Sequence, residues 1–450
     1  MAVSAARAVA FEILLRVERE QSYADELLHS ARLAKLSCRD HGLATALVMG
    51  VLRWQCLLDQ RLAAASSQKP ERLDNEVLTA LRLGVYQLQF LSRVPAHAAI
   101  FESVELVKAA RKRSAGPFVN AVLRKIAGTG AKNSLAEVDL SEISKSPDSL
   151  TLAQNAAHPP WLVERWTEHY GLEAAREICA HDQTVPDTAI HIHDNQADAD
   201  LAAAGVQLSP GRLLSEARRV VAGDVTGTRA YQEGRVSIQD EASQLVALLA
   251  GRGETILDCC AAPGSKTALL ARRNPRAKVL ATELHPHRAR LLQSLSRSPN
   301  IHVVAADAGH LPFSRAFDRI LADVPCSGTG TLARNPEIKW RLKAEDLQDL
   351  QSRQVAILKS ALAQLATGGR LVYSTCSLER EENEAVVEAA LDETAEFKVT
   401  DLKGELEQLR QSGELSSGFD VASVLAGPYL RTIPGVHPCD GFFAAMIERR

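Results

Sequence analysis

The stretch LDCCAAPGSKT, residues 257–267, decides the fold of the C-terminal half of the chain. Its apolar start predicts a β-strand, its Pro-Gly pair predicts a tight turn, and the residues that follow predict a helix. Small residues in such a turn let backbone N–H groups approach a ligand, and the helix N-terminus favours negative charge. The stretch lacks GxGxxG, and a Walker A loop would need a glycine where Cys259 stands. By itself it fits a ligand-binding turn and a purely structural βα turn equally well.

Short apolar runs recur after this turn, and helical patterns separate several of them. The runs are AKVLATE, IHVVAAD, FDRILAD and GRLVYSTC, while HRARLLQSLSRS and LQDLQSRQVAILKSALAQLA are typical of helices. Strands that alternate with helices predict a parallel sheet with helices on both faces. Because ligands of open α/β sheets bind at the carboxyl ends of the strands, we expect the functional residues there.

Acidic residues stand at the ends of three successive predicted strands: Glu283, Asp307 and Asp323. An acid that ends the second strand of a nucleotide-binding sheet can accept hydrogen bonds from both ribose hydroxyls. An acid that ends the third can accept one from an adenine amino group. Taken singly, each acid also fits a solvated strand end. Three acids in register with the turn favour a ligand site.

Two cysteines follow predicted strands at the same edge of the sheet. Cys326 lies in ADVPCSGTG and Cys376 in YSTCSLEREEN, where Pro, Ser and Gly neighbours predict exposed loops. A thiol near a helix N-terminus or a cation can be held partly as thiolate, the nucleophilic form. No nearby His or Cys completes a tetrahedral set with either residue, so we expect no metal site.

Residues 1–130 have the sequence of an all-helical domain. Apolar residues recur at helical spacing without strand-like alternation, and Pro95 and Pro117 separate predicted helices. This part carries 18 basic and 12 acidic residues, whereas the rest carries 34 basic and 43 acidic ones. A basic domain joined to an acidic one suggests contact with a polyanion such as a nucleic acid, although chance also produces a difference of this size.

Composition changes along the chain predict three further parts. Residues 131–150 are polar with few large apolar groups, which is typical of a linker. Residues 151–235 begin with a predicted helix that ends at Gly171 and then contain short strand patterns, so we interpret them as a small α+β connecting module. Residues 236–450 then form the α/β domain.

The overall composition is that of a soluble globular protein. The 450 residues are 46% hydrophobic and 24% charged, and no uninterrupted apolar run approaches the roughly 20 residues that span a bilayer. The first 20 residues are apolar on one helical face only and contain three glutamates, so they do not resemble a signal peptide. Eight scattered cysteines without a repeated CxxC predict neither a disulfide framework nor a structural zinc site. We therefore expect a cytoplasmic protein with no membrane contact.

Several of these motifs together resemble a known family. CAAPGSKT, DVPCSGTGT with NPEIKW, and YSTCSLEREEN resemble the signatures of the S-adenosylmethionine-dependent RNA cytosine-5 methyltransferases. The resemblance extends over residues 151–450 and includes SIQDEASQLVA at 237–247 and HPCDGFFAAMIER at 437–449. The stretch at 95–126 resembles a NusB-type RNA-binding domain. The resemblance thus implies an all-α NusB-like N-terminal domain followed, after the small α+β module, by a Rossmann-like α/β methyltransferase domain.

The resemblance also implies roles for individual residues. The methionine portion of S-adenosyl-L-methionine would lie against the turn of Cys260, Ala261, Ala262, Pro263, Gly264, Ser265 and Lys266. Glu283 would bind the ribose hydroxyls, Asp307 the adenine, and Asp323 would lie at the junction of cofactor and base. Cys376 would be the nucleophile, and Cys326 would assist product release. Ser265 stands where the family usually has a second glycine, and Glu283 stands where it often has Asp.

The pairing of the two domains resembles bacterial enzymes that methylate a cytosine of 16S ribosomal RNA. It implies that the partner is 16S ribosomal RNA or a small-subunit assembly intermediate, and that the protein acts as a monomer. A tRNA cytosine-5 methyltransferase is an alternative that the catalytic half does not exclude. A non-catalytic RNA-binding ribosome-assembly factor is another. A nicotinamide-dependent oxidoreductase is disfavoured, because GxGxxG is absent and the paired cysteines are present.

Overall fold

The computed structural model describes residues 3–20, 22–29, 36–66, 68–128, 140–194, 196–296, 298–314, 316–392 and 394–450. The chain folds as two compact units. The helical unit comprises Met1–Val185 together with Leu332–Arg341, and the α/β unit comprises Pro186–Thr331 together with Leu342–Arg450. Each unit has its own hydrophobic core.

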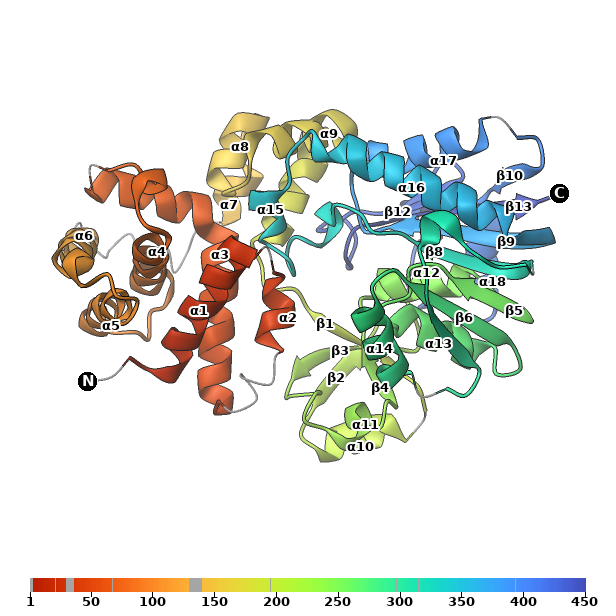
Figure 1. Ribbon diagram of the computed structural model, residues 1–450, viewed down its shortest axis with the longest axis horizontal. Helices are drawn as coiled ribbons and strands as arrows, with labels where there is room; N and C mark the ends of the chain where they lie inside the picture. The colour runs from red at the N-terminus through yellow and green to blue at the C-terminus, as the bar shows by residue number, and fades with distance from the viewer. Residues whose placement is uncertain are drawn as a thin grey trace. The chain divides into compact units, whose positions relative to one another are not determined.

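The first part of the helical unit is an all-α bundle, as the sequence predicts (Figure 1). Its core consists of leucines at helical spacing, such as Leu47, Leu58 and Leu81, none of which is exposed to solvent. The helices of this bundle are α1 (Ala5–Glu20), α2 (Ala24–Leu28), α3 (Cys38–Ser66), α4 (Asn75–Phe90), α5 (Ala96–Ala109) and α6 (Gly116–Gly128).

Helix α3 is the central helix of this bundle. Helices α1 and α4 both pack against it. Among the described helices it alone has the length and apolar composition that could cross a membrane, but half of its apolar window is buried inside the protein. This degree of burial is typical of a helix in the core of a folded domain.

Residues 140–182 continue the helical unit with α7 (Leu140–Ser144), α8 (Ser149–Asn155) and α9 (Pro160–Asp182). Of the predicted linker 131–150, residues 131–139 lie outside the described residues, and most of the remainder is helical. Gly171 lies within the range of α9 but has a φ of 83° and a ψ of 158°, which are not helical. Two helical stretches therefore meet at Gly171, and the first of them ends where the sequence predicts a helix end.

Residues 332–341 return to the helical unit, although they follow Cys326 closely in the sequence. The segment ends in α15 (Ile338–Arg341). The indole N–H of Trp340 donates to the Leu52 carbonyl at 2.7 Å, and the Lys339 ammonium donates to the Arg53 carbonyl at 2.9 Å. A Glu337 carboxylate oxygen accepts from the Ala24 N–H at 2.8 Å. The motif NPEIKW is thus part of the helical unit's interior.

The α/β unit begins with a small antiparallel sheet in the order β2-β3-β1-β4. Its elements are β1 (Thr188–Ile192), α10 (Ala197–Ala203), β2 (Gln207–Pro210), β3 (Ala217–Ala222), α11 (Arg229–Gln232) and β4 (Val236–Ile238). The short strand patterns in the sequence correspond to β3 and β4. This α+β structure begins near residue 186, because residues 151–185 fold with the helical unit.

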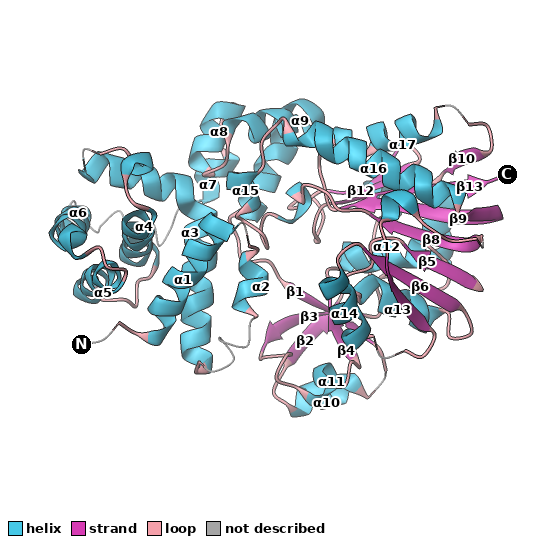
Figure 2. Ribbon diagram, viewed as in Figure 1, coloured by secondary structure: helices cyan, strands magenta, loops and turns pink. Residues whose placement is uncertain are grey.

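The larger sheet has the order β11-β12-β13-β9-β8-β5-β6-β7, and β10 also pairs with β13. Strands β7, β6, β5, β8 and β9 are parallel, as predicted, and β13 runs antiparallel to β9. Figure 2 shows β6, β5, β8 and β9 side by side. The strands are β5 (Thr255–Asp258), β6 (Lys278–Glu283), β7 (Ile301–Ala305), β8 (Phe317–Asp323), β9 (Leu365–Thr375), β10 (Phe397–Thr400), β11 (Leu425–Ala426), β12 (Tyr429–Thr432) and β13 (Phe442–Arg449).

Helices cover both faces of this sheet, as the alternation of its side chains requires. Ile256 belongs to a core with the helices on one face, whereas its neighbour Leu257 belongs to a core with those on the other. The first face carries α12 (Glu241–Leu249), α13 (Ser265–Arg273), α14 (Pro286–Leu295) and α18 (Leu402–Gln411), and the second carries α16 (Asp346–Ala363) and α17 (Glu384–Leu391). The antiparallel strands β10 to β13 were not predicted from the sequence.

The burial of Lys339 leads to a pH-dependent stability. Burial lowers the pKa of Lys339 to about 7 in the folded chain, below its unfolded value of 10.5. The unfolded chain therefore binds more protons between these values, and stability rises with pH. Relative to Lys339→Met, the free energy of unfolding of the wild type should rise by on the order of 1 kcal/mol per pH unit from pH 7 to pH 9.

Denaturant unfolding followed by tryptophan fluorescence measures this change, because the four tryptophans all belong to the helical unit. Lys69→Met, at an exposed lysine of the same unit, controls for the loss of one positive charge. A wild-type advantage that is the same at both pH values would contradict the prediction.

Candidate active site

The turn after β5 is held between the two neighbouring strands. The Ala261 N–H donates to the Thr282 carbonyl of β6, and the Cys259 N–H donates to the Leu321 carbonyl of β8, both at 2.9 Å. Gly264 has a φ of 116°, a conformation that favours glycine. Ser265 begins α13 without a positive φ, so its Cβ does not strain the backbone at this position.

The acids after β6 and β7 are placed differently. Glu283 is 6% exposed, and its Oε1 accepts from the His285 N–H at 3.0 Å. Its Oε2 lies 4.0 Å from the Arg288 guanidinium. Asp307 is exposed and accepts from the Gly309 N–H at 2.8 Å, and this hydrogen bond, with a further one from His310, lowers its pKa. Both carboxylates stand at the carboxyl ends of adjacent parallel strands.

The acid that ends β8 forms a partly buried ion pair with the turn. Asp323 Oδ2 lies 2.8 Å from Lys266 Nζ, and its Oδ1 accepts from the Ser374 hydroxyl at 2.7 Å. Burial alone would lower the pKa of Lys266, but the Asp323 carboxylate raises it above its ordinary value. The same ammonium lies 5.2 Å from the centre of the Phe442 ring. Lys266 thus places a fixed positive charge beside the strand ends.

The acid that ends β5 was not singled out from the sequence. Asp258 is 1% exposed and accepts from the Thr267 hydroxyl at 2.6 Å. Burial raises the pKa of Asp258 to about 6. Perturbed carboxyl groups of this kind cluster at functional sites. Its position, one strand before the predicted acids, is the signal that identifies it in the sequence.

The two predicted cysteines are brought together from loops that are 50 residues apart. The Sγ atoms of Cys326 and Cys376 lie 3.3 Å from each other. The hydrogen bond to Cys376, together with burial, raises the pKa of Cys326 well above its ordinary value. The Gly330 N–H donates to the Cys376 carbonyl at 2.9 Å, and this bond ties the loop after β8 to the loop after β9. Cys326 is therefore a protonated thiol near neutral pH.

A single buried carboxylate joins these two cysteine loops. Glu382 has no solvent exposure, and it accepts from the Ser327 N–H at 2.8 Å and from the Ser327 hydroxyl. The Ser377 hydroxyl donates to it at 2.5 Å, and the Gln354 amide of α16 donates at 2.9 Å. Ser327 and Ser377 directly follow the two cysteines. Glu382 was not among the predicted site residues, although the quoted motif YSTCSLEREEN contains it.

The predicted residues thus gather at one edge of the sheet. The turn from Cys260 to Lys266, the strand-end acids and both cysteines follow the carboxyl ends of β5, β6, β7, β8 and β9. Carboxylates after the second and third strands of the turn's sheet fit a ligand that has a ribose and an adenine. No group of three or more His, Cys, Asp or Glu residues that could hold a metal ion occurs in the described part of the chain.

Comparison with known proteins identifies the family. The family model "16S rRNA methyltransferase RsmB/F" matches residues 245–448, and the NusB family model matches residues 4–128. A probable ribosomal RNA small subunit methyltransferase B of Bacillus subtilis is 34% identical over the whole of both chains. The chain belongs to this family. The Vibrio cholerae ribosomal RNA small subunit methyltransferase B is 33% identical, over 92% of this chain and 90% of its own.

Solved structures share this fold. The crystal structure of PH0851 has a TM-score of 0.80 over 99% of this chain and 98% of its own, at 22% identity. A methyltransferase homologue of Pyrococcus horikoshii is 26% identical, with a TM-score of 0.55 over 68% of this chain and 100% of its own. The predicted fold class is confirmed: a NusB-like helical domain precedes a methyltransferase domain, whose sheet is mixed. The family uses S-adenosyl-L-methionine, and this cofactor is the one that the sequence predicts.

The contacts of Glu382 predict that it positions the two thiols. Glu382→Gln replaces one acceptor oxygen by an amide N–H2 that faces hydroxyl donors, so the Ser327 and Ser377 loops should lose their common anchor. We expect methyl transfer to fall by about 10–100-fold, since the lost charged hydrogen bonds are worth about 1.5–3 kcal/mol.

A thiol reagent that bridges neighbouring cysteines measures the geometry independently of activity. The yield of the Cys326–Cys376 bridge should fall in Glu382→Gln and stay at the wild-type level in Glu388→Gln, an exposed glutamate of α17. A normal bridging yield in an inactive Glu382→Gln variant would exclude the positioning role.

Proposed function

We propose that this chain methylates C5 of a cytosine in 16S ribosomal RNA through a covalent adduct between Cys376 and C6 of the base. The observation that carries the proposal is the pair of thiols, 3.3 Å apart, beside the Asp323–Lys266 ion pair. The named relatives of Bacillus subtilis and Vibrio cholerae are ribosomal RNA small subunit methyltransferases, which supports this RNA as the substrate.

The proposed reaction proceeds in three steps: addition of the thiol, methyl transfer and elimination. Cys376 forms a bond from its sulfur to C6, and the electron pair of the C5–C6 double bond moves toward C5 and the N3 side of the ring. S-adenosyl-L-methionine, when bound, would supply a methyl group on a positively charged sulfur to the activated C5, and would leave as S-adenosylhomocysteine. Loss of the C5 proton to a base then restores the double bond, and the Cys376 sulfur leaves C6.

Asp323 and Lys266 provide the electrostatics for these steps. The Asp323 carboxylate can accept a hydrogen bond from the amino group of the cytosine and so orient the base. The Lys266 ammonium adds a positive charge beside the ring, where negative charge develops on addition of the thiol. Cys326 keeps its proton near neutral pH, so it can protonate or hydrogen-bond the departing Cys376 thiolate at product release.

The cofactor would lie along the carboxyl ends of β5, β6 and β7. The turn from Cys260 to Lys266 would hold the methionine portion, Glu283 would accept from the ribose hydroxyls, and Asp307 would accept from the adenine. Among the described residues, the contact of Glu283 Oε2 is with Arg288 at 4.0 Å, so this oxygen can still accept from a ligand, which supports the role.

The helical N-terminal part would bind the RNA. Residues 1–130 carry an excess of basic residues and match the NusB family, whereas residues 236–450 contain the proposed reaction centre. The NusB match favours ribosomal RNA over tRNA as the substrate. The thiol contact favours catalysis over a purely structural role in ribosome assembly. We infer that the protein acts in the cytoplasm as a monomer.

Binding of the cofactor can be tested by calorimetry. Glu283→Ala should weaken the binding of S-adenosyl-L-methionine by about 1–3 kcal/mol, because hydrogen bonds from the ribose are lost. Glu254→Ala, just before β5 at the opposite edge of the sheet, is the matched control and should bind normally. Equal affinities of the two variants would exclude the role of Glu283.

The two thiols can be separated by trapping the covalent adduct. Cys376→Ala should give no adduct and no methylation, because the bond to C6 does not form. Cys326→Ala should still allow addition and methyl transfer, and should accumulate a protein–RNA species that survives denaturation. A denaturing gel after incubation with 16S rRNA and S-adenosyl-L-methionine reads out both results.

Two outcomes contradict the proposed roles. An adduct in Cys376→Ala but not in Cys326→Ala would reverse them. Methylation by the wild type with no adduct in any variant would argue against the covalent route.

A further inference from the structure

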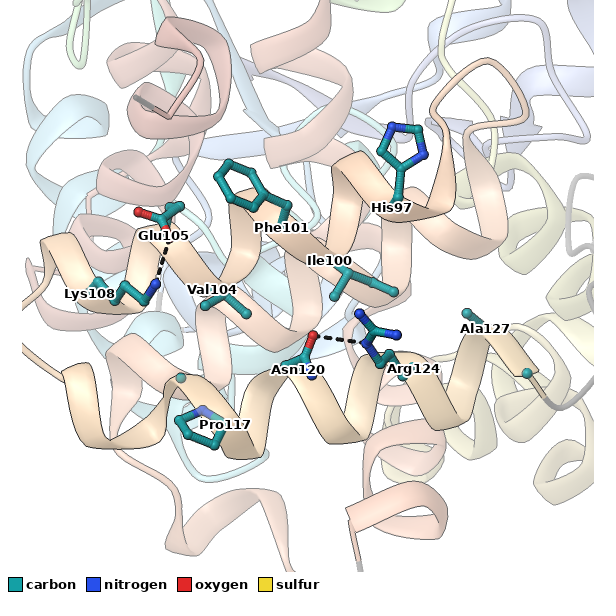
Figure 3. A pocket seen from close by; sticks show the side chains of 12 residues that line it. His97, Ile100, Phe101, Val104, Glu105, Lys108, Pro117, Asn120, Arg124 and Ala127 are labelled. Atoms are coloured by element: carbon teal, nitrogen blue, oxygen red, sulfur yellow. Dashed lines mark hydrogen bonds and ion pairs between the residues drawn. The ribbon is translucent and has the colours of Figure 1, made fainter. Parts of the chain in front are cut away.

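An open groove of about 850 Å³ runs between α5 and α6 of the helical unit (Figure 3). We call it the α5–α6 groove, and we define it by Ile100, Phe101, Val104, Lys108, Asn120 and Arg124. The groove plays no part in the reaction centre described above.

An aromatic ring on α5 borders this groove without being buried. Phe101 is 39% exposed, whereas its neighbour Ile100 is 9% exposed and packs in the core. Figure 3 shows the Phe101 ring on the outer side of α5. The ring therefore presents a flat apolar face that the core of the helical unit does not need.

Basic side chains surround the groove. Lys108 and Arg124 line it, and Arg111 and Arg113 lie in the connection between α5 and α6. Arg124 is exposed and donates to the neutral Asn120 side chain at 3.1 Å, so its charge is not neutralised by that contact. Residues 96–128 contain six Lys and Arg residues and two acids.

Both of these acids are already engaged in ion pairs. Glu102 lies 3.0 Å from Arg7, and Glu105 lies 2.8 Å from Lys108. Because Glu105 neutralises Lys108 and Asp74 pairs with Lys112, the positive charge around the groove comes from Arg111, Arg113, Arg124 and Lys125. The surface combines a positive field with an exposed ring, and these are the two features that unpaired nucleic acid requires.

We propose that the α5–α6 groove binds an unpaired segment of RNA, with one base stacked on Phe101 and an adjoining phosphate on Arg124. The proposal rests on the proposed function and specifies where the helical unit reads its RNA. An unpaired base stacks on an aromatic side chain, whereas a duplex keeps its bases stacked on each other and presents mainly phosphates and hydroxyls. An acidic protein helix would need a continuous apolar strip, but polar His97 and Asn120 interrupt this groove.

Fluorescence anisotropy with the full-length protein tests the stacking. The probes are a labelled single-stranded RNA 12-mer of mixed sequence and the duplex of the same sequence. Phe101→Leu should weaken binding of the single strand by about tenfold. Phe101→Tyr should bind it as the wild type does, because a tyrosine ring also stacks. Binding of the duplex should be the same for all three proteins.

A charge variant tests the phosphate contacts. Arg124→Glu should weaken binding of the single strand and reduce the slope of its salt dependence by about one. Arg39→Glu, at the exposed start of α3, makes the same charge change elsewhere in the unit and is the matched control.

Three results would overturn the proposal. The first is wild-type affinity for the single strand in both Phe101→Leu and Arg124→Glu, and the second is an equal loss of affinity in Arg124→Glu and Arg39→Glu. The third is that these groove variants lose affinity for an acidic peptide but bind the RNA as the wild type does. Transfer of labelled methyl groups to 16S rRNA by the wild type is measured separately. Its absence would overturn the proposed function without affecting the binding results.

Discussion

The parallel pairing of β6, β5, β8 and β9 is the constraint on which the reaction centre depends. Parallel strands end at the same edge of a sheet, so residues far apart in the sequence become neighbours. The ends of β8 and β9 bring Cys326 and Cys376 to 3.3 Å from each other. The same order places Asp323 beside Lys266, which stands at the start of the helix after β5. Antiparallel pairing of any of these strands would scatter these groups over both edges.

Buried charge is the second principle of this site, and it is used in two ways. The Asp323–Lys266 pair is partly buried and neutral as a whole, which lowers the cost of removing both charges in part from water. Glu382 has no cationic partner among its described contacts, and four hydrogen bonds to two serines and Gln354 compensate its burial instead. Such an arrangement has few alternative geometries, so it gives the two cysteine loops a defined spacing.

The helical unit shows a similar use of polar groups in a core. Lys339 and Trp340 enter it from a segment that follows the Cys326 loop, and each donates to backbone carbonyls near the middle of α3. These carbonyls belong to Leu52 and Arg53, so a short motif of the second half completes the interior of the first. The segment therefore connects the loop of one proposed catalytic residue with the NusB-like part of the chain by a short covalent path.

The sequence by itself determined the classes of the two halves, the parallel strands and the cofactor, because these depend on local periodicity and on motifs that are continuous in the chain. It also singled out Cys326, Cys376 and Asp323, since each stands directly after an apolar run. The roles of these residues remain predictions. Only the tertiary structure decided the positions of Glu382, Lys339 and the antiparallel strand β13. Glu382 and Lys339 are held by hydrogen-bond partners that include residues 28 and 286 positions away in the sequence. Strand β13 has an apolar run that is buried on both faces. Hydrogen bonds and burial between distant segments leave no periodic signal in the sequence, which is why local patterns predict strands and motifs but not the contacts that join them.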